Sequence, residues 1–450
     1  MVSIFRPSNN RKKPAKRAGG SASILTSIEI DTIEHQGVGV ASKHSPVIFV
    51  EGALPGEVCD VEVLQSKRHF MKGRVKRLIT ASSDRQKPFC EHSSTCGGCQ
   101  LDYIKPESLR AMRKQAIGQL LNRMAKVDDI DWQADIFEDD LGYRRKARFS
   151  IDARNPNKIA FGYRGAAQSK VVDIERCQIL DPQLQLLYPA LKQWVNQCDQ
   201  AQHLGHVIVF QGDQRALIQI KATRDLKQSV ITSLEQLGKQ LDCVVTLESA
   251  SGLISAICGE LESIVFSPMP GMPLPIGAND FVQVNHKVNQ KMVQQAIDWL
   301  NLGKNHRVLE LFCGAGNFSL PLVKSGAHLL GVEGVASMVE RAKQNIAQDA
   351  PQQCEFVCAD LSDKKVVSQL LADSSDAVLM DPSREGASVV CESISAKRHP
   401  KIVYVSCNPA SFARDTKLLM SQGYKMDKIS LIEMFPYTKH TELMASFVAI

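Results

Sequence analysis

The segment RVLELFCGAGNFSLPLVKSG, residues 307–326, decides the fold because its pattern changes twice within a short stretch. Arg307 to Phe312 is an apolar run typical of a buried strand, Gly314 and Gly316 make a turn, and a helical pattern follows. Glycines in such a turn let the backbone approach a ligand closely at the N-terminus of the helix. The segment therefore predicts a strand–turn–helix unit that binds a nucleoside-type cofactor.

Acidic residues end the next two predicted strands. HLLGVEG ends in Glu333, and CEFVCADL ends in Asp360. Glu333 is placed to accept both hydroxyls of a ribose, and Asp360 to meet an adenine amino group. The turn reads G-x-G-N, closing on Asn317, rather than G-x-G-x-x-G, which favours S-adenosylmethionine over a dinucleotide. Strands and helices alternate from residue 276, which predicts a doubly wound, Rossmann-like α/β domain over residues 276–450.

Two further strand ends carry the predicted chemistry. DAVLMDPSREG ends a strand at Asp381, and KIVYVSCNPASFARD ends the next strand at Ser406 and Cys407. Ligands of open α/β sheets bind outside the carboxyl ends of the strands, so Cys407 is expected where the substrate lies. The alternative, a buried inert cysteine, is disfavoured because the polar residues around Cys407 indicate a loop.

A nucleophilic cysteine beside this cofactor suits methylation of a pyrimidine carbon. Carbon 5 of uracil is a poor nucleophile, but addition of a thiolate to carbon 6 turns the ring into an enolate that can attack a methyl sulfonium. A base must then remove the carbon-5 proton so that the thiol can leave. The segment 431–450 offers Glu433, His440 and Glu442 as bases, and Asp381 can hydrogen-bond the uracil edge.

Charge is unevenly distributed along the 450 residues. The net charge is +6, from 54 Lys and Arg against 48 Asp and Glu. Residues 1–180 hold 30 basic against 21 acidic side chains, which leaves 24 against 27 in the remainder. A basic front half suggests a polyanion partner, and a solvated basic surface is the alternative. No apolar run is long enough to cross a membrane, and the first residues do not read as a signal peptide.

The front of the chain divides into a tail and a predicted small barrel. Residues 1–20 are basic and rich in Pro and Gly, so disorder is expected. Residues 21–80 contain five short β-type segments separated by Gly, Pro or Ser, which predicts a barrel of the oligonucleotide-binding kind. Residues 81–275 are expected to form a mixed α/β domain, in which the predicted helix 106–126 can dock on the catalytic domain.

A cysteine cluster lies in FCEHSSTCGGCQ. Cys90, Cys96 and Cys99 have C-x5-C-x2-C spacing, which suits a metal or an iron–sulfur cluster, and Cys177 is the best candidate for a fourth ligand. His92 could instead complete a zinc site. Three reduced cysteines in a loop is the alternative without a metal. Thirteen cysteines in a long chain fit a reducing compartment better than a disulfide scaffold.

The segments DPSREG, IVYVSCNPASF and MFPYTKHTE resemble the signatures of the TrmA/RumA family of RNA uracil-C(5) methyltransferases. With the cofactor motif, the resemblance covers roughly residues 276–450. It implies Cys407 as nucleophile and Glu442 as the base that abstracts the proton. It also implies a cofactor and active-site lining made by Gln283, Phe312, Gly314, Gly316, Asn317, Glu333, Asp360 and Asp381.

The front half also resembles parts of this family. Residues 21–80 are similar to a TRAM domain, an RNA-binding barrel, and the cysteine loop is similar to the family's 4Fe-4S site with Cys90, Cys96, Cys99 and Cys177 as ligands. This architecture is that of the family branch that acts on 23S rRNA, so the resemblance implies uracil 1939 as the target. The chain departs from the usual family pattern at Glu433, at Ala410 or Ser411, and at Tyr437, which leaves local loop contacts open.

The resemblance implies a cytoplasmic monomer that binds 23S rRNA. Three alternatives remain. The same chemistry could serve another rRNA or a tRNA uracil, which the barrel and the cysteine loop disfavour for tRNA. An iron–sulfur oxidoreductase of Rossmann type would need a bound flavin or nicotinamide, and the G-x-G-N turn opposes it. A non-catalytic RNA-binding protein is opposed by the intact motifs around Cys407 and Glu442.

Overall fold

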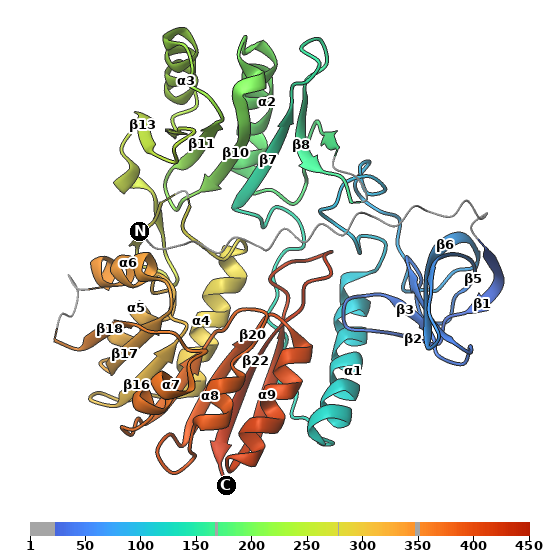
Figure 1. Cartoon of the computed structure of the whole chain (residues 1–450), viewed down its shortest axis with the longest axis vertical. Helices are drawn as coiled ribbons and strands as arrows, with labels where there is room; N and C mark the ends of the chain where they lie inside the picture. The colour runs from blue at the N-terminus through green and yellow to red at the C-terminus, as the bar shows by residue number, and fades with distance from the viewer. Residues whose placement is uncertain (1–22, 167–169, 278, 347–351) are drawn as a thin grey trace. The chain divides into compact units, whose positions relative to one another are not determined.

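The computed structural model of the chain describes residues 23–166, 170–277, 279–346 and 352–450, and it contains two compact units (Figure 1). The first unit takes in the described residues up to Thr32 together with Val38–Ser82. The second takes in Ile33–Gly37 and Ser83–Ile450. A short segment near the front of the chain therefore belongs to the larger unit. The tail predicted at residues 1–20 lies outside the described residues.

The first unit is a six-stranded sheet with the strand order β1-β5-β6-β4-β3-β2. The first of the five β-type segments expected from the sequence, ILTSIEIDTIE (residues 24–34), is not one strand but two. The chain turns there because Ile30 N–H bonds Glu57 O at 2.9 Å and the Asp31 carboxylate accepts from Ser42. The two edge strands of this sheet, β1 and β2, are neighbours in sequence. The strands are β1 (Ile24–Glu29), β2 (Thr32–Ile33), β3 (Gly39–Ala41), β4 (Val47–Glu51), β5 (Val58–Ser66) and β6 (Phe70–Thr80).

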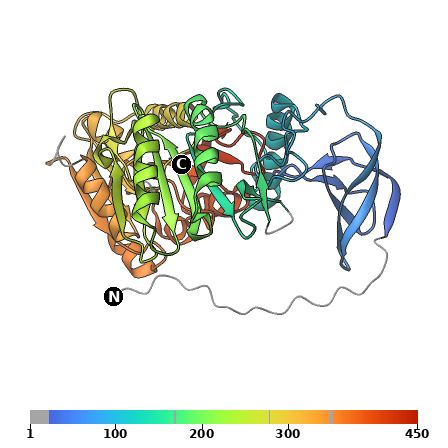
Figure 2. The same cartoon turned by 90° about the horizontal axis from the view of Figure 1, so that it is seen from above.

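The middle of the chain forms a mixed sheet with the order β13-β12-β11-β10-β7-β8-β9. Helices α2 (Pro182–Gln197) and α3 (Gln228–Gln240) share one apolar core with it and cover one face (Figure 2). A small hairpin, β14 (Val265–Phe266) and β15 (Leu274–Pro275), follows. The strands of the mixed sheet are β7 (Lys146–Asp152), β8 (Ala160–Arg164), β9 (Val171–Asp173), β10 (Leu204–Gln211), β11 (Ala216–Ala222), β12 (Val244–Glu248) and β13 (Ile254–Cys258).

The last part of the chain is a seven-stranded sheet with the order β18-β17-β16-β19-β20-β22-β21. Five strands are parallel: β16 (Arg307–Leu311), β17 (His328–Glu333), β18 (Cys354–Cys358), β19 (Ala377–Met380) and β20 (Lys401–Ser406). The final strand β22 (Glu442–Ala449) runs antiparallel between β20 and β21 (Tyr424–Ile432). The Rossmann-type fold predicted for residues 276–450 is confirmed. The insertion of the antiparallel strand β22 between β20 and β21 was not predicted.

Helices cover both faces of this sheet, because its strands are apolar on both sides and must be shielded twice. They are α4 (His286–Leu300), α5 (Ser319–Lys324), α6 (Ala336–Ile346), α7 (Lys364–Leu370), α8 (Ser388–Ser393) and α9 (Pro409–Ser421). The long helix α1 (Pro106–Ala125) joins them from far upstream and packs beside α9 (Figure 1). Ile117 and Leu121 of α1 are fully buried in the same core as Phe412 and Leu443.

Candidate active site

One edge of the parallel sheet collects the ends of four strands. The register pairs Leu311 with Met380 and Met380 with Tyr404, so Phe312, Asp381 and the end of β20 lie side by side. The antiparallel strand β22 begins at this same edge, because Ser406 is paired with Leu443. Cys407, which follows Ser406, and Glu442, which precedes Leu443, therefore emerge next to each other.

The glycine turn after β16 is open and left-handed. Phe312, Gly314 and Gly316 have φ angles of 62°, 57° and 102°. A Cβ on Gly314 would meet nothing within 4 Å, so the backbone there is accessible to a ligand. Glu333 at the end of β17 faces the turn: its Oε2 accepts from Gly314 N at 3.2 Å and its Oε1 from Val335 N at 3.0 Å. This geometry fits a cofactor held between the turn and Glu333.

Asn317 and Asp360 flank the turn in different ways. The side chains of Asn317 and Asn289 exchange two hydrogen bonds of 3.0 Å, which ties the turn to α4. Asp360 lies beyond β18 and accepts from the backbone and hydroxyl of Ser362. The hydroxyl contact, followed by the backbone contact, lowers the pKa of Asp360. The carboxylate is therefore charged and exposed where the third strand ends.

Two carboxyl groups lie near each other at the centre of the edge, the buried one of Glu442 and the half-buried one of Asp381. Burial, with the nearby Asp381 second, raises the pKa of Glu442 to about 8. Burial also raises the pKa of Asp381 to about 7. Glu442 is only 6% exposed, and its Oε2 has no hydrogen-bond partner among the described residues. A carboxyl group with such a pKa can accept a proton near neutral pH, which suits a general base.

Cys407 faces the two acids. Burial, followed by the nearby Glu442 and Asp381, raises the pKa of its thiol to about 11, although Arg384 acts in the opposite direction. The helix α9 starts directly after this residue, since Asn408 caps it by accepting from Ala410 N at 3.1 Å. Asn408 Nδ2 also donates to Arg384 O at 2.9 Å. Cys407 is thus held between a helix N-terminus and Arg384, both of which favour a thiolate.

A family model described as tRNA (uracil-5-)-methyltransferase matches residues 111–446. The chain belongs to the tRNA (uracil-5-)-methyltransferase family. It is therefore a methyltransferase that binds S-adenosylmethionine. A protein of Alteromonas mediterranea named 23S rRNA (uracil(1939)-C(5))-methyltransferase RlmD is 40% identical over 93% of this chain and 87% of its own length. A protein of the same name from Vibrio parahaemolyticus is 35% identical over 99% of both chains.

The fold of this uracil methyltransferase also matches a solved structure. The crystal structure of Pyrococcus abyssi tRNA (uracil-54, C5)-methyltransferase in complex with S-adenosyl-L-homocysteine covers 93% of this chain and 99% of its own, with a TM-score of 0.70 and 21% identity. At that identity the likeness establishes the fold. Among the described residues no helix is long and apolar enough to cross a membrane.

Gln283 and Phe281 lie in the segment that leads into α4 of the methyltransferase. Gln283 is buried, with 8% exposure, and its Oε1 has no hydrogen-bond partner in the part of the chain that the structure describes. Phe281, two residues earlier, is 68% exposed. Sequence reasoning singled out Gln283 and missed Phe281, because an aromatic residue in a short apolar run gives no sign of whether it is buried. An exposed ring two residues from Gln283 offers a stacking surface.

The four predicted cluster ligands lie around one cavity of about 240 Å³. Cys90, Cys96, Cys99 and Cys177 line it, together with His92, Arg144 and Tyr163. Burial raises the pKa values of Cys96, Cys99 and Cys177, and Gly98 N donates to Cys96 Sγ at 3.4 Å. In the described ranges, however, no three His, Cys, Asp or Glu side chains form a group that could hold a metal ion. The structure gathers the four thiols but does not confirm a metal site.

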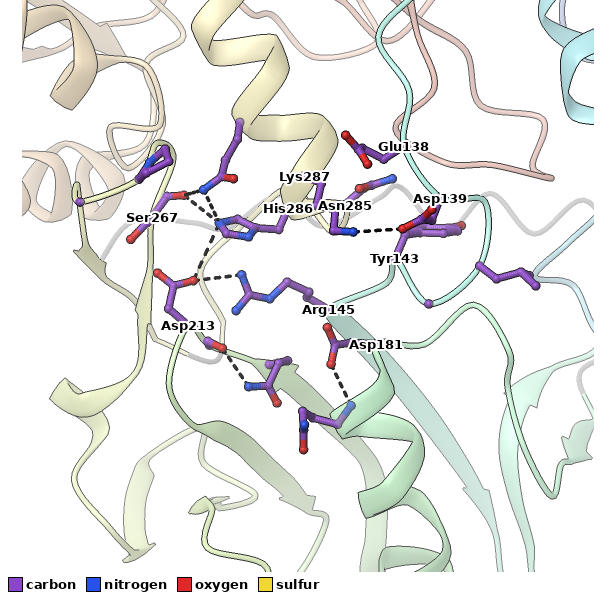
Figure 3. A pocket seen from close by; sticks show the side chains of 18 residues that line it. Glu138, Asp139, Tyr143, Arg145, Asp181, Asp213, Ser267, Asn285, His286 and Lys287 are labelled. Atoms are coloured by element: carbon purple, nitrogen blue, oxygen red, sulfur yellow. Dashed lines mark hydrogen bonds and ion pairs between the residues drawn. The ribbon is translucent and has the colours of Figure 1, made fainter.

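A larger cavity of about 490 Å³ lies between the mixed sheet and the start of α4 (Figure 3). None of the predicted catalytic or cofactor residues lines it. Its charged groups are paired with one another: Arg145 Nη1 lies 3.0 Å and His286 Nε2 3.8 Å from Asp213 Oδ1, and Lys287 Nζ lies 3.0 Å from Asp139 Oδ2 (Figure 3). This cavity is separate from Cys407, Asp381 and Glu442, none of which lines it.

Proposed function

We propose that this methyltransferase methylates carbon 5 of a uracil in 23S rRNA, and that the target is uracil 1939, as in the names of its relatives. The observation that carries the chemistry is the meeting of Cys407 with Glu442 at the start of β22. The reaction needs a nucleophile, a base and a methyl donor. The thiol of Cys407, the carboxyl group of Glu442 and the cofactor-binding glycine turn would supply these three at one edge of the sheet. The relatives named for 23S rRNA are 40% and 35% identical to this chain, against 21% for the solved tRNA enzyme, and this difference favours rRNA over tRNA as substrate.

Cys407 and Glu442 divide the reaction between them. The Cys407 thiol loses its proton, and the thiolate forms a bond to carbon 6 while the ring electrons move onto oxygen 4. The resulting enolate attacks through carbon 5 and takes up a methyl group. Glu442 then removes the carbon-5 proton, the carbon 5–carbon 6 double bond re-forms, and the bond to sulfur breaks with its electron pair returning to Cys407. Asp381 is placed to hydrogen-bond the uracil edge.

The residues around the glycine turn fit S-adenosylmethionine, which supplies a methyl group on a sulfonium. Glu333 would accept from the ribose hydroxyls, and Asp360 would meet the adenine. Gly314 leaves space for close backbone approach, Gly316 lets the turn pack against Ile346, and Phe312, Asn317 and Gln283 complete the lining. The open position at Gly314 and the buried, unpartnered Gln283 Oε1 support this assignment.

The strands of residues 21–80 are proposed to bind RNA as a TRAM barrel. Phe70 lies outside the apolar core of this unit, and its ring has Lys67 Nζ at 5.3 Å and Lys72 Nζ at 5.9 Å from its centroid. A half-buried aromatic ring between two cations suits a base stacked between phosphates. Arg74 and Arg77 are already paired with Glu62 and Asp60, so phosphate contact is assigned to the lysines and Arg68.

The cysteine loop is proposed to hold a 4Fe-4S cluster through Cys90, Cys96, Cys99 and Cys177. Four soft thiol donors around one cavity, with a backbone N–H directed at Cys96 Sγ, fit an iron–sulfur cluster better than a zinc ion. The cluster belongs to the proposed central domain of residues 81–275, ahead of the catalytic domain of residues 276–450. The protein is proposed to act as a cytoplasmic monomer.

The function is tested by incubating the protein with labelled S-adenosylmethionine and unmodified 23S rRNA, then mapping the methylated base. Unmodified tRNA and 16S rRNA are the parallel substrates. Label at uracil 1939 alone supports the proposal. Label at another rRNA uracil, or faster methylation of tRNA, would assign the same chemistry to a different substrate.

A further inference from the structure

The loop between β21 and β22, residues 433–441, carries the proposed base at its end. Ile432 pairs with Glu442, so the loop leaves and re-enters the sheet at one point. Within it Tyr437 has a φ angle of 62°, a conformation that a bulky residue keeps only when its surroundings hold it there. This pairing holds the backbone of Glu442, so the loop can affect only the direction of its side chain and the groups beside it.

Arg113 of α1 contacts the loop at two places. Its Nη2 donates to Thr438 O in the middle of the loop, and its Nη1 lies 3.7 Å from Glu433 Oε1 at the beginning. Arg110, one turn earlier on α1, reaches only Glu433, through its Oε2. Arg113 and Glu433 are 2% and 3% exposed, so this is a buried ion pair. Burial lowers the pKa of Arg113 to about 10, which leaves it charged at neutral pH.

Other segments bind the same loop through single hydrogen bonds. Leu101 N donates to Tyr437 O at 2.9 Å, Lys439 N donates to Gln100 Oε1 at 3.3 Å, and Thr441 Oγ1 donates to His35 O at 3.0 Å. Each of these fixes one position. Among the residues that the structure describes, Arg113 alone joins the first residue of the loop to its centre, and it does so with a charge that is fixed by packing.

We propose that Arg113 is a positioning residue for proton abstraction: by clamping Glu433 and Thr438 O, it sets the geometry in which Glu442 meets the carbon-5 proton. The inference rests on the proposed function. Thiol addition and methyl uptake depend on Cys407 and the glycine turn, which the clamp does not touch. Loss of the clamp should therefore slow the last step selectively, and methylated RNA should remain bonded to the protein.

The test compares Arg113→Lys with Arg110→Lys, two substitutions on one helix that both keep a positive charge facing Glu433. Single-turnover methyl transfer and release of RNA from the covalent adduct are measured separately. We expect release to slow by about 100-fold in Arg113→Lys, since misplacement by about 1 Å can cost that much, while methyl transfer and cofactor affinity stay near wild type. Arg110→Lys should release RNA at the wild-type rate.

A second variant guards against misfolding, because removing one member of a buried pair leaves the other charge unpaired. Arg113→Met with Glu433→Gln removes both charges, and it should fold and show the same slow release. Release at the wild-type rate in either variant would overturn the inference. So would a parallel loss of cofactor binding, methyl transfer and release, because that is the result of a merely structural role. If the wild-type protein itself forms no adduct with 5-fluorouracil RNA, the proposed function fails instead.

Discussion

The environment of individual side chains at the sheet edge explains why a thiol and two acids can work together. Cys407 and Glu442 have raised pKa values, chiefly because Cys407 is partly and Glu442 fully withdrawn from water. Each group is therefore neutral until a proton leaves, and Arg384 is the charge that favours departure from Cys407. Burial makes the carboxyl group of Glu442 a stronger base than an exposed one, and it would keep water away from the proposed bond between Cys407 and the uracil.

Cys407→Ala should abolish turnover, because no other described thiol meets Glu442, and cofactor affinity should stay near wild type. Trapping with 5-fluorouracil RNA measures the adduct directly, since fluorine cannot leave as a proton. Cys358→Ala is the matched control: Cys358 is an exposed cysteine at the end of β18 in the same sheet. Substantial methylation by Cys407→Ala would refute the nucleophile.

Glu442→Gln should permit thiol addition and methyl uptake but stall elimination. Methylated RNA should then migrate with the protein in denaturing electrophoresis. Glu385→Gln, at an exposed carboxyl group beside Arg384, serves as the control. If Glu442→Gln releases methylated RNA at the normal rate, the base that removes the carbon-5 proton is His440 or a water molecule instead.

The rate of elimination should rise with pH between 6 and 9. A base acts only when deprotonated, and the raised pKa of Glu442, about 8, keeps most of it protonated at pH 7. The rate should therefore fall about tenfold for each pH unit well below 8. The rate at which RNA is released from the covalent adduct in a single turnover, measured across this pH range, tests whether elimination speeds up with rising pH. A rate that is flat from pH 6 to 9 would show that Glu442 is ionised throughout, contrary to its burial.

The strand–turn–helix units were the elements most readily predicted from sequence, because their signals are local. The turn at Gly314 and the strand ends at Glu333, Asp381 and Cys407 all follow from short patterns and parallel-sheet topology. The antiparallel β22 was not predicted, since its neighbours in the sheet are decided by pairing over long separations. The ion pair between Arg113 and Glu433 was not predicted for the same reason, because 320 positions separate the two residues in the sequence.

At the cysteine loop we expect anaerobically purified protein to be brown, with about four iron and four sulfide per chain. Cys96→Ser should lose iron and lower thermal stability or RNA affinity before it affects methyl transfer to a short RNA. Cys198→Ser is the control, because Cys198 ends α2 and does not line the cavity. Stoichiometric zinc with no visible absorbance would favour the zinc alternative.

At the scale of the whole molecule, the division into two units changes how RNA binding should be tested. Residues 33–37 belong to the larger unit, and His35 O accepts from Thr441, the neighbour of Glu442. Deleting residues 1–80 would therefore remove a hydrogen bond to the catalytic loop along with the strands. Substitutions on the surface of the first unit separate the two effects.

Replacing Lys67, Arg68 and Lys72 with Gln should weaken RNA binding and flatten its salt dependence. The slope of log K against log salt should fall by about 0.7–0.9 for each phosphate that the protein no longer neutralises, while S-adenosylmethionine binding is unchanged. Arg215, Lys227 and Lys239, each paired with an acid in the central part of the chain, are the matched triple. An unchanged slope in the first triple would show that these cations do not meet RNA.

The placement of β22 between β20 and β21 has a consequence for biosynthesis. A ribosome delivers β20 and β21 before β22, so both remain with unpaired edges until the last strand arrives to fill the gap. Leu443, Met444 and Phe447 of this strand are fully buried in the cores on the two faces of the sheet. Closure of both cores is therefore the final event of folding, and a chain stalled before residue 442 would leave them open to water.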